Sequence, residues 1–194
     1  GFRGEDGVIY KDSYADYNIQ NAVKNGILVG IYFNSTAISE SEASEEAAYT
    51  VNAIQGYKIS YPVVYDCEGF NLSSSRMNAL TNTQRTNNAL AFLKYVNSSG
   101  YDAMTYSSTS ELENSSSWNT SSLAKYKIWV ARYPATTYPD IKVPPYSGKY
   151  NMWQYTNKGS VSGISGNVDL DIAYFSVTES TAKNSAATTA AATT

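Results

Sequence analysis

Residues 61–70 read YPVVYDCEGF, a short apolar run followed by Asp66, Cys67, Glu68 and a glycine. A continuous apolar run of this length, bounded by turn residues, is typical of a buried strand. Alternate residues of a strand point to opposite faces, so we expect Asp66 and Glu68 on one side and Cys67 on the other. Charged groups at the end of a buried strand usually have a partner or a function. The stretch therefore predicts a strand that presents two acids together.

Apolar runs and helical patterns alternate along the rest of the chain. Strands are predicted at residues 27–33, 62–65, 102–106, 127–131, 152–155 and 168–175. Helices are predicted at residues 14–25, from Ser39 through about Ile54, and from Thr81 to just before Gly100. Ser39 and Thr81 are each followed three residues later by Glu or Gln, which is the pattern of a capping box. This alternation indicates an α/β fold with a parallel sheet and crossover helices, either open or closed into a barrel.

The later part of the chain is expected to contain less helix. Residues 107–124 are rich in Ser and Asn, and residues 134–150 hold four of the five prolines, so both are predicted to be long structured loops. Residues 177–194 consist mostly of Ala, Thr and Ser and are predicted to be a flexible tail or linker. Residues 1–176 are then expected to form one domain.

Composition excludes several kinds of chemistry. The 194 residues include one Cys and no His, so intrachain disulfides, His-based triads and His-ligated metal sites are excluded. Acid–base chemistry must come from Asp, Glu, Tyr or Lys, and we expect no cofactor and no metal. The net charge of −3 provides no basic surface for nucleic acid or an anionic membrane. No apolar stretch approaches the ~20 residues of a membrane span.

Asp66 and Glu68 have a chemical use if the sheet is a barrel. The carboxyl ends of barrel strands form the mouth, where active sites lie. Two carboxylates at one mouth raise each other's pKa, so one of them can hold a proton near neutral pH. Acid-catalysed cleavage of a glycosidic bond needs such a group. The alternative is a pair of solvated acids at a strand end, because D-x-E alone is a weak motif.

Longer motifs extend the pattern along the chain. YPVVYDCEGF resembles the PVV-x-D-x-E strand of the family 25 glycoside hydrolases, which are bacterial and phage muramidases of the lysozyme type. GILVGIYFNSTAISESEASEEA is similar to the family's G-I-x-V-G-V-Y-F-x-S-x-A segment and the helix after it. YDAMTYSS and YKIWVARYP resemble its fifth and sixth strands, and MWQYTNKGSVSGISGNVDLDIAYF resembles its closing segment. The resemblance covers Gly1 to about Phe175 in the family's order.

The resemblance implies an irregular TIM-like β/α barrel that hydrolyses the β-1,4 bond between N-acetylmuramic acid and N-acetylglucosamine in peptidoglycan. Glu68 matches the family's general acid/base. Asp66 matches the carboxylate that assists the substrate's N-acetyl group or stabilises positive charge on the sugar. Asp169 matches the Asp of the last strand, although a structural carboxylate is an equal alternative. Asp171 stands where the family often has Asn.

The resemblance also implies a glycan groove. The matching strand residues are Tyr32, Tyr106, Trp129, Trp153 and Gln154. Trp153 and Gln154 are expected to supply an aromatic wall and a polar anchor, whereas Trp129 is the one most expected in the core. Arg132 and Tyr133 follow the sixth strand and are expected at the rim. Arg132 pairs either with acidic groups of the substrate or with a carboxylate of the protein.

The chain departs from the family at its start. The family's first two strands, and the active-site Asp of the first, have no match, so about six of its eight strands are expected here. We expect an incomplete record of a longer chain. The alternatives are that another polypeptide supplies the strands, or that the short form folds alone as a non-catalytic wall-binding relic. Unpaired strand edges would be a stability and aggregation liability in either case.

These observations predict a muramidase of a bacterium or its phage, extracellular or associated with the cell wall. Its expected partners are peptidoglycan glycan strands and a missing N-terminal segment or cell-wall-binding module, with no nucleic acid and no membrane. One alternative is a non-catalytic glycan-binding or structural protein on a degraded muramidase barrel. Another is a hydrolase of a different N-acetylglucosamine polymer such as chitin.

Overall fold

The computed structural model describes residues 1–177. Its strands are β1 (Phe2–Arg3), β2 (Ile9–Tyr10), β3 (Ile31–Asn34), β4 (Val63–Asp66), β5 (Ala103–Ser108), β6 (Lys127–Ala131), β7 (Met152–Gly159) and β8 (Val168–Ala173). Its helices are α1 (Ala15–Lys24), α2 (Glu40–Ala53), α3 (Asn82–Ser98), α4 (Thr109–Leu112) and α5 (Thr120–Leu123). The tail predicted at residues 177–194 lies outside the described residues, except for its first residue.

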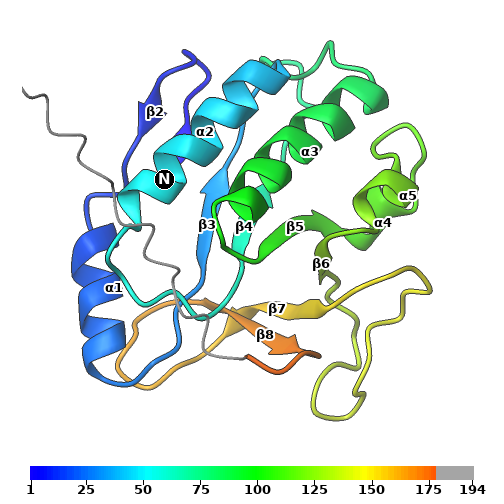
Figure 1. Cartoon of the computed structure of the whole chain (residues 1–194). Helices are drawn as coiled ribbons and strands as arrows, with labels where there is room; N and C mark the ends of the chain where they lie inside the picture. The colour runs from blue at the N-terminus through cyan, green and yellow to red at the C-terminus, as the bar shows by residue number, and fades with distance from the viewer. Residues whose placement is uncertain (178–194) are drawn as a thin grey trace, which may run out of the picture.

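The strands form one mixed sheet in the order β2-β1-β3-β4-β5-β6-β7-β8, and this sheet is not closed (Figure 1). The four successive pairs from β3–β4 to β6–β7 are parallel, as expected. The pairs β1–β2 and β7–β8 are antiparallel, which differs from the parallel sheet that we expected. Residues 160–167 between β7 and β8 are too few for the crossover that a parallel pair needs, so the chain returns as a hairpin.

All six predicted strands are present, and β1 and β2 are additional. Each of these two strands has only two residues, which is too short to leave a periodic signal in the sequence. The three predicted helices are confirmed as α1, α2 and α3. The short helices α4 and α5 lie within the segment 107–124 that was expected to be loop.

Helix caps explain where α2 and α3 begin. The Thr81 side chain accepts a hydrogen bond from the Gln84 amide, and Gln84 accepts one from the Thr81 amide, which completes a capping box. Ser39 caps α2 by accepting from the Glu42 amide. The Glu42 carboxylate, however, accepts from the Ile38 amide, so the box predicted at Ser39 is only half formed.

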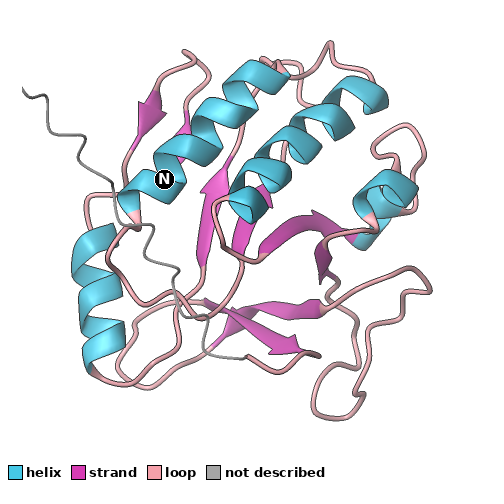
Figure 2. Cartoon of the chain, viewed as in Figure 1, coloured by secondary structure: helices cyan, strands magenta, loops and turns pink. Residues whose placement is uncertain are grey.

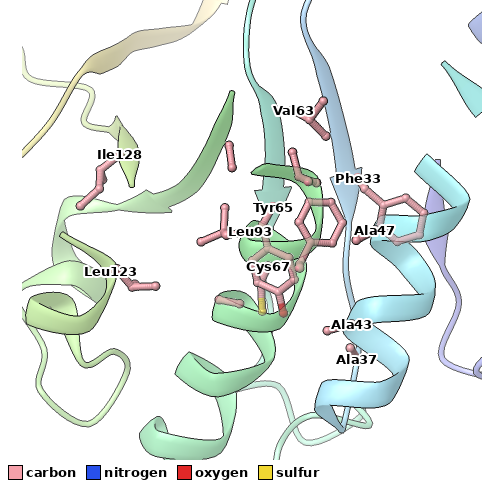
Figure 3. Packing of buried hydrophobic residues seen from close by; sticks show 14 of the residues in the cluster. Phe33, Ala37, Ala43, Ala47, Val63, Tyr65, Cys67, Leu93, Leu123 and Ile128 are labelled. Atoms are coloured by element: carbon pink, nitrogen blue, oxygen red, sulfur yellow. The ribbon is translucent and has the colours of Figure 1, made fainter. Parts of the chain in front are cut away.

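Helices α2 and α3 lie side by side and pack together, and α3 also packs on β4 and β5 (Figure 2). The main core fills the space between these helices and the sheet. Figure 3 shows ten of its residues by name: Phe33, Ala37, Ala43, Ala47, Val63, Tyr65, Cys67, Leu93, Leu123 and Ile128. The small residues Ala43 and Ala47 of α2 are fully buried in this core. No helix in residues 1–177 has the length and apolar character that crossing a bilayer requires.

The opposite face of the sheet carries a second, smaller cluster. Val64, Met104, Tyr106 and Ala131 are buried there, with Trp129 packed against them. We call this the inner face; the same alternation places Asp66 on it. The sheet therefore separates an apolar core under the helices from an inner face that ends in polar groups.

Candidate active site

Asp66 and Glu68 lie at the carboxyl end of β4, between two parallel neighbours. In the register of the sheet, Asn34 on β3 is opposite Asp66, and Asp66 is opposite Tyr106 on β5. Asp66 and Glu68 both line an open cavity of about 1070 Å³, while Cys67 between them is fully buried in the main core. The expected alternation along this stretch is confirmed.

The Asp66 side chain is 9% exposed and incompletely hydrogen-bonded. Its Oδ2 accepts a hydrogen bond of 3.3 Å from Asn34 Nδ2, whereas its buried Oδ1 has no partner in the described part of the chain. Burial, and then the charge of Glu68, raise the pKa of Asp66 to about 7, and the Asn34 hydrogen bond acts in the opposite direction. Asp66 is therefore an acid that can hold a proton near neutral pH.

Glu68 is exposed to the cavity, in contrast to Asp66. Partial desolvation raises the pKa of Glu68 above its ordinary value, and the charges of Glu111 and Asp169 raise it further. Two carboxyl groups of different burial thus face the same cavity, which we call the groove. This arrangement lets one of them act as an acid beside the other.

Strand β8 contributes two more acids. Asp169 is exposed, and its charge also raises the pKa of Tyr32 and Tyr133, which places it beside the same groove. Asp171 is half-buried and accepts a 2.9 Å hydrogen bond from Trp129 Nε1. Burial raises the pKa of Asp171 to about 6, and the charge of Asp169 adds to this effect.

A tyrosine pair fixes the amide of Gln154, which is buried at the carboxyl end of the inner face. Tyr106 Oη donates a 2.9 Å hydrogen bond to Gln154 Oε1, and Tyr133 Oη donates to the same oxygen. The charge of Glu68 contributes to the raised pKa of both tyrosines, after burial as the main cause. Tyr106, Tyr133 and Gln154 therefore form one polar cluster close to Glu68.

The two tryptophans lie on opposite faces of the sheet, and Trp153 differs from the expectation. Trp153 is 0% exposed and lies in the main core, where its Nε1 donates to the Arg132 carbonyl at 2.8 Å, so it forms no wall of the groove. Trp129, expected in the core, packs against the smaller buried cluster of the inner face, in agreement with that expectation, and its ring lies edge-to-face on Tyr106 at 4.8 Å. The reason is alternation: Trp153 directly precedes Gln154, whose side chain lies on the inner face, so the Trp153 side chain points to the opposite face.

The two remaining predicted residues are at the periphery. Tyr32 is 60% exposed and lines the large cavity together with the acid pair. Arg132 is exposed, and its amide donates to the Gln154 carbonyl at 3.1 Å. Within residues 1–177 its guanidinium forms no ion pair, which leaves it available to a ligand.

Sequence reasoning missed two residues of the site, Asn34 and Glu111. Asn34 directly follows the predicted strand 27–33, so its place at a carboxyl strand end could have identified it. Glu111 stands three residues after Ser108, which is the spacing of a capping box. In the described residues, no group of three or more Asp, Glu or Cys side chains could hold a metal ion.

Comparison with known proteins gives one family. The model described as Glycosyl hydrolases family 25 matches residues 3–164. The chain is 27% identical over 170 residues to the autolytic lysozyme of Clostridium acetobutylicum, covering 87% of this chain and 46% of that protein. It is 28% identical over 172 residues to lysozyme M1 of Streptomyces globisporus, covering 86% and 56% respectively. The chain thus spans about half the length of these relatives.

Solved structures agree with the sequence comparison. The CTP1L endolysin superposes with a TM-score of 0.65 at 28% identity, over 85% of this chain and 54% of that one. The modular autolysin LytC of Streptococcus pneumoniae gives 0.70 at 26% identity, over 88% and 38%. The muramidase of Trichobolus zukalii gives 0.65 over 91% and 80%, and at 20% identity it supports the fold alone.

Proposed function

Because this chain belongs to glycosyl hydrolase family 25, we propose that it is a muramidase that cleaves the β-1,4 bond between N-acetylmuramic acid and N-acetylglucosamine in peptidoglycan. The observation that carries the proposal is the pairing of buried Asp66 with exposed Glu68 in one groove. The names of the relatives support it, since they are lysozymes and an autolysin. LytC has also been solved with a synthetic peptidoglycan ligand.

Glu68 is proposed as the general acid/base. Its raised pKa favours the protonated form, and its exposure lets the glycosidic oxygen of a bound glycan approach. The proton passes from Glu68 to the leaving oxygen as the bond breaks. Glu68 then accepts a proton from the attacking group that completes hydrolysis.

Asp66 is proposed to act on the sugar next to the broken bond. Its carboxyl group lines the cavity with Glu68 and is proposed to act on the substrate's N-acetyl group or on positive charge that develops on the sugar ring. Asn34 holds the other oxygen and so orients the carboxyl group. Asp169 is proposed as a third acid beside the groove.

Binding of the glycan is proposed to use the exposed and inner-face side chains around the pair. These are Tyr32, Tyr106, Tyr133, Gln154 and Arg132. Tyrosine offers sugars a flat apolar face together with a hydroxyl, and the Arg132 guanidinium suits the acidic lactyl and peptide groups of peptidoglycan. The proposed place of action is the cell wall, with residues 1–176 as the catalytic domain.

The test is digestion of purified peptidoglycan, with chitin as a parallel substrate and mass analysis of the sugar ends released. The proposal expects reducing N-acetylmuramic acid ends from peptidoglycan and no product from chitin. Glu68→Gln is expected to lower the rate roughly 10²–10⁴-fold, which is the usual contribution of a general acid. Asp66→Asn is expected to abolish cleavage.

Asp102→Asn is the matched control, because Asp102 is an exposed acid in a surface ion pair with Lys127, just before β5 begins. It is expected to keep the activity of the unchanged chain. Full activity in Glu68→Gln would contradict its assignment as the acid. Binding of peptidoglycan without any cleavage by the unchanged chain would instead support a glycan-binding protein.

A further inference from the structure

Glu111 is held in one position by four hydrogen-bonding interactions at the start of α4. Its Oε2 accepts from Ser107 Oγ at 2.7 Å, from Ser108 Oγ at 3.0 Å and from the Ser108 amide at 3.2 Å. The Glu111 amide donates back to Ser108 Oγ, which completes a capping box. Trp118 Nε1 donates to Ser107 Oγ at 3.1 Å, so the Ser107 hydroxyl proton is directed at Glu111.

The sheet register places this carboxylate beside the acid pair. Strand β4 ends at Asp66 and its parallel neighbour β5 ends at Ser108, so Glu68 and Glu111, which follow these two strands, both lie at the carboxyl edge of the sheet. Glu111 folds back onto Ser108, which keeps its carboxylate at this edge of the sheet. In agreement, the charge of Glu111 contributes to the raised pKa of both Glu68 and Asp66.

The cap itself does not require a charge at this position. Helix α3 begins with the same motif, in which Gln84 takes the place of Glu and forms both hydrogen bonds with Thr81. A glutamine at position 111 would satisfy the Ser108 amide equally well. The negative charge of Glu111 is therefore a feature that capping leaves unexplained.

We propose that Glu111 is an electrostatic positioning residue for Glu68: its fixed negative charge favours the protonated form that Glu68 needs as a general acid. The inference rests on the proposed function of Glu68. Glu111 does not touch the substrate; it acts through Glu68.

Other groups face Glu68 as well and set the background. Asp66 precedes it on β4, Asp169 faces it from β8, and the phenols of Tyr106 and Tyr133 face it from β5 and from the segment after β6. Asp171, also on β8, feels the charge of Asp169.

The charge of Glu111 also acts on a cation, Arg85. The Arg85 guanidinium of α3 stacks on Phe70 at 3.9 Å and donates to the Ser117 carbonyl at 2.6 Å. The charge of Glu111 acts to raise the pKa of Arg85, so Glu111 interacts electrostatically with this cation as well as with Glu68.

The experiment separates charge from capping with two substitutions. Glu111→Gln keeps the hydrogen-bond acceptor and removes the charge, whereas Glu111→Asp keeps the charge and shortens the reach to the Ser108 amide. The rate per substrate concentration, kcat/KM, is measured against pH on soluble peptidoglycan fragments. Loss of a like charge lowers the pKa of Glu68, so the basic limb of the profile is expected to move to lower pH in Glu111→Gln.

In Glu111→Asp the basic limb is expected to stay close to that of the unchanged chain, even if the melting temperature falls. Glu113→Gln is the matched control: Glu113 is two residues further on, is exposed, and its charge acts on Tyr146 rather than on the acid pair. The shift in Glu111→Gln should also shrink in high salt, because screening weakens it. An unmoved basic limb in Glu111→Gln, or equal shifts in all three variants, would overturn the proposal.

A second measurement is independent of activity. The Glu68 carboxyl is titrated by carbon-13 NMR in the full chain without substrate. The proposal expects a lower Glu68 pKa in Glu111→Gln than in the unchanged chain and in Glu113→Gln. If this shift appears but no variant cleaves peptidoglycan, the proposed function fails and the electrostatic coupling stands; no NMR shift in an active enzyme rejects the coupling alone.

Discussion

At the scale of single residues, Asp66 combines a cost in stability with a use in chemistry. Its carboxyl is buried at the end of β4, with one oxygen unpartnered among the described residues. Burial of an acid favours the protonated form, which is why its pKa rises to about 7 from an ordinary 3.8. The same burial raises the free energy of the ionised form, so the ionised Asp66 carboxylate destabilises the folded protein.

This cost has a definite pH dependence. The folded-state pKa of Asp66 exceeds its unfolded value, so the folded state binds the proton more tightly. The stability that this proton contributes is therefore fully present below about pH 4 and is lost as pH rises through about 7. The raised pKa corresponds to at most about 4 kcal/mol at alkaline pH. We therefore expect Asp66→Asn to raise the melting temperature at pH 8 more than at pH 4, as measured by calorimetry.

Asp102→Asn serves as the comparison, since the Asp102 side chain is exposed and its ion pair lies at the surface. It should change the melting temperature little at either pH. Equal stabilisation by Asp66→Asn at both pH values would contradict the account, because a neutral asparagine should help only where the aspartate is ionised.

At the scale of elements, β1 is attached by side chains more than by its backbone. The strand has two residues and one register pair with β3, Phe2 opposite Asn34. Arg3 Nε donates to Glu46 Oε1 on α2 at 2.7 Å, and its other nitrogens reach Glu45 Oε2 at 2.7 Å and the Gly7 carbonyl at 2.6 Å. A buried ion pair therefore ties the start of the chain to α2.

We expect Arg3→Met to destabilise the protein by about 3–5 kcal/mol, because it leaves the fully buried Glu46 without its cation. Burial already raises the pKa of Glu46 to about 7, with Arg3 acting in the opposite direction. The loss should therefore be larger at pH 8 than at pH 5. Urea unfolding curves at both pH values measure it.

Lys11→Met is the control for this prediction. Lys11 forms an ion pair of 2.6 Å with Asp16, but both side chains are substantially exposed. Exposed pairs contribute roughly 0–1 kcal/mol, so the change should be small. A similar loss in Lys11→Met and Arg3→Met would show that burial of the pair is not the cause.

At the scale of the whole molecule, the two faces of the sheet are packed differently. Val63 is fully buried in the main core under the helices. Its neighbour Val64 points to the inner face, where it lines an apolar cavity of about 230 Å³ with Met104, Trp129 and Met152. Val63 and Val64 are therefore two adjacent valines, one in the filled main core and the other beside a cavity on the inner face.

This arrangement predicts opposite effects of the same substitution. Val64→Ile adds a methylene group next to free volume and should be neutral or stabilising by up to about 1 kcal/mol. Val63→Ile adds it to a filled core and should destabilise by about 1–3 kcal/mol. Melting temperatures of the two variants decide the matter, and equal losses in both would mean that the inner face is packed as densely as the core.

The sequence by itself determined where the main helices and strands lie along the chain. It also determined which side chains of one strand share a face. The apolar run before Asp66, the capping residue Thr81 and the helical spacing of residues 14–25 act over a few positions, so six strands and three helices were predictable. Strand alternation also fixed Asp66 and Glu68 on one face, with Cys67 on the other. These properties depend only on backbone geometry and adjacent residues.

Only the tertiary structure decided how distant segments meet. It brought Asn34 and Glu111 to the acid pair, buried Trp153 in the main core, and paired β7 with β8 as a hairpin. Alternation relates the residues of one strand to each other, but which of its two faces meets the helices depends on packing across the sheet. The raised pKa of Asp66 arises mainly from burial, and burial depends on how distant elements pack around the strand end; the charge of Glu68, two residues away, adds to it.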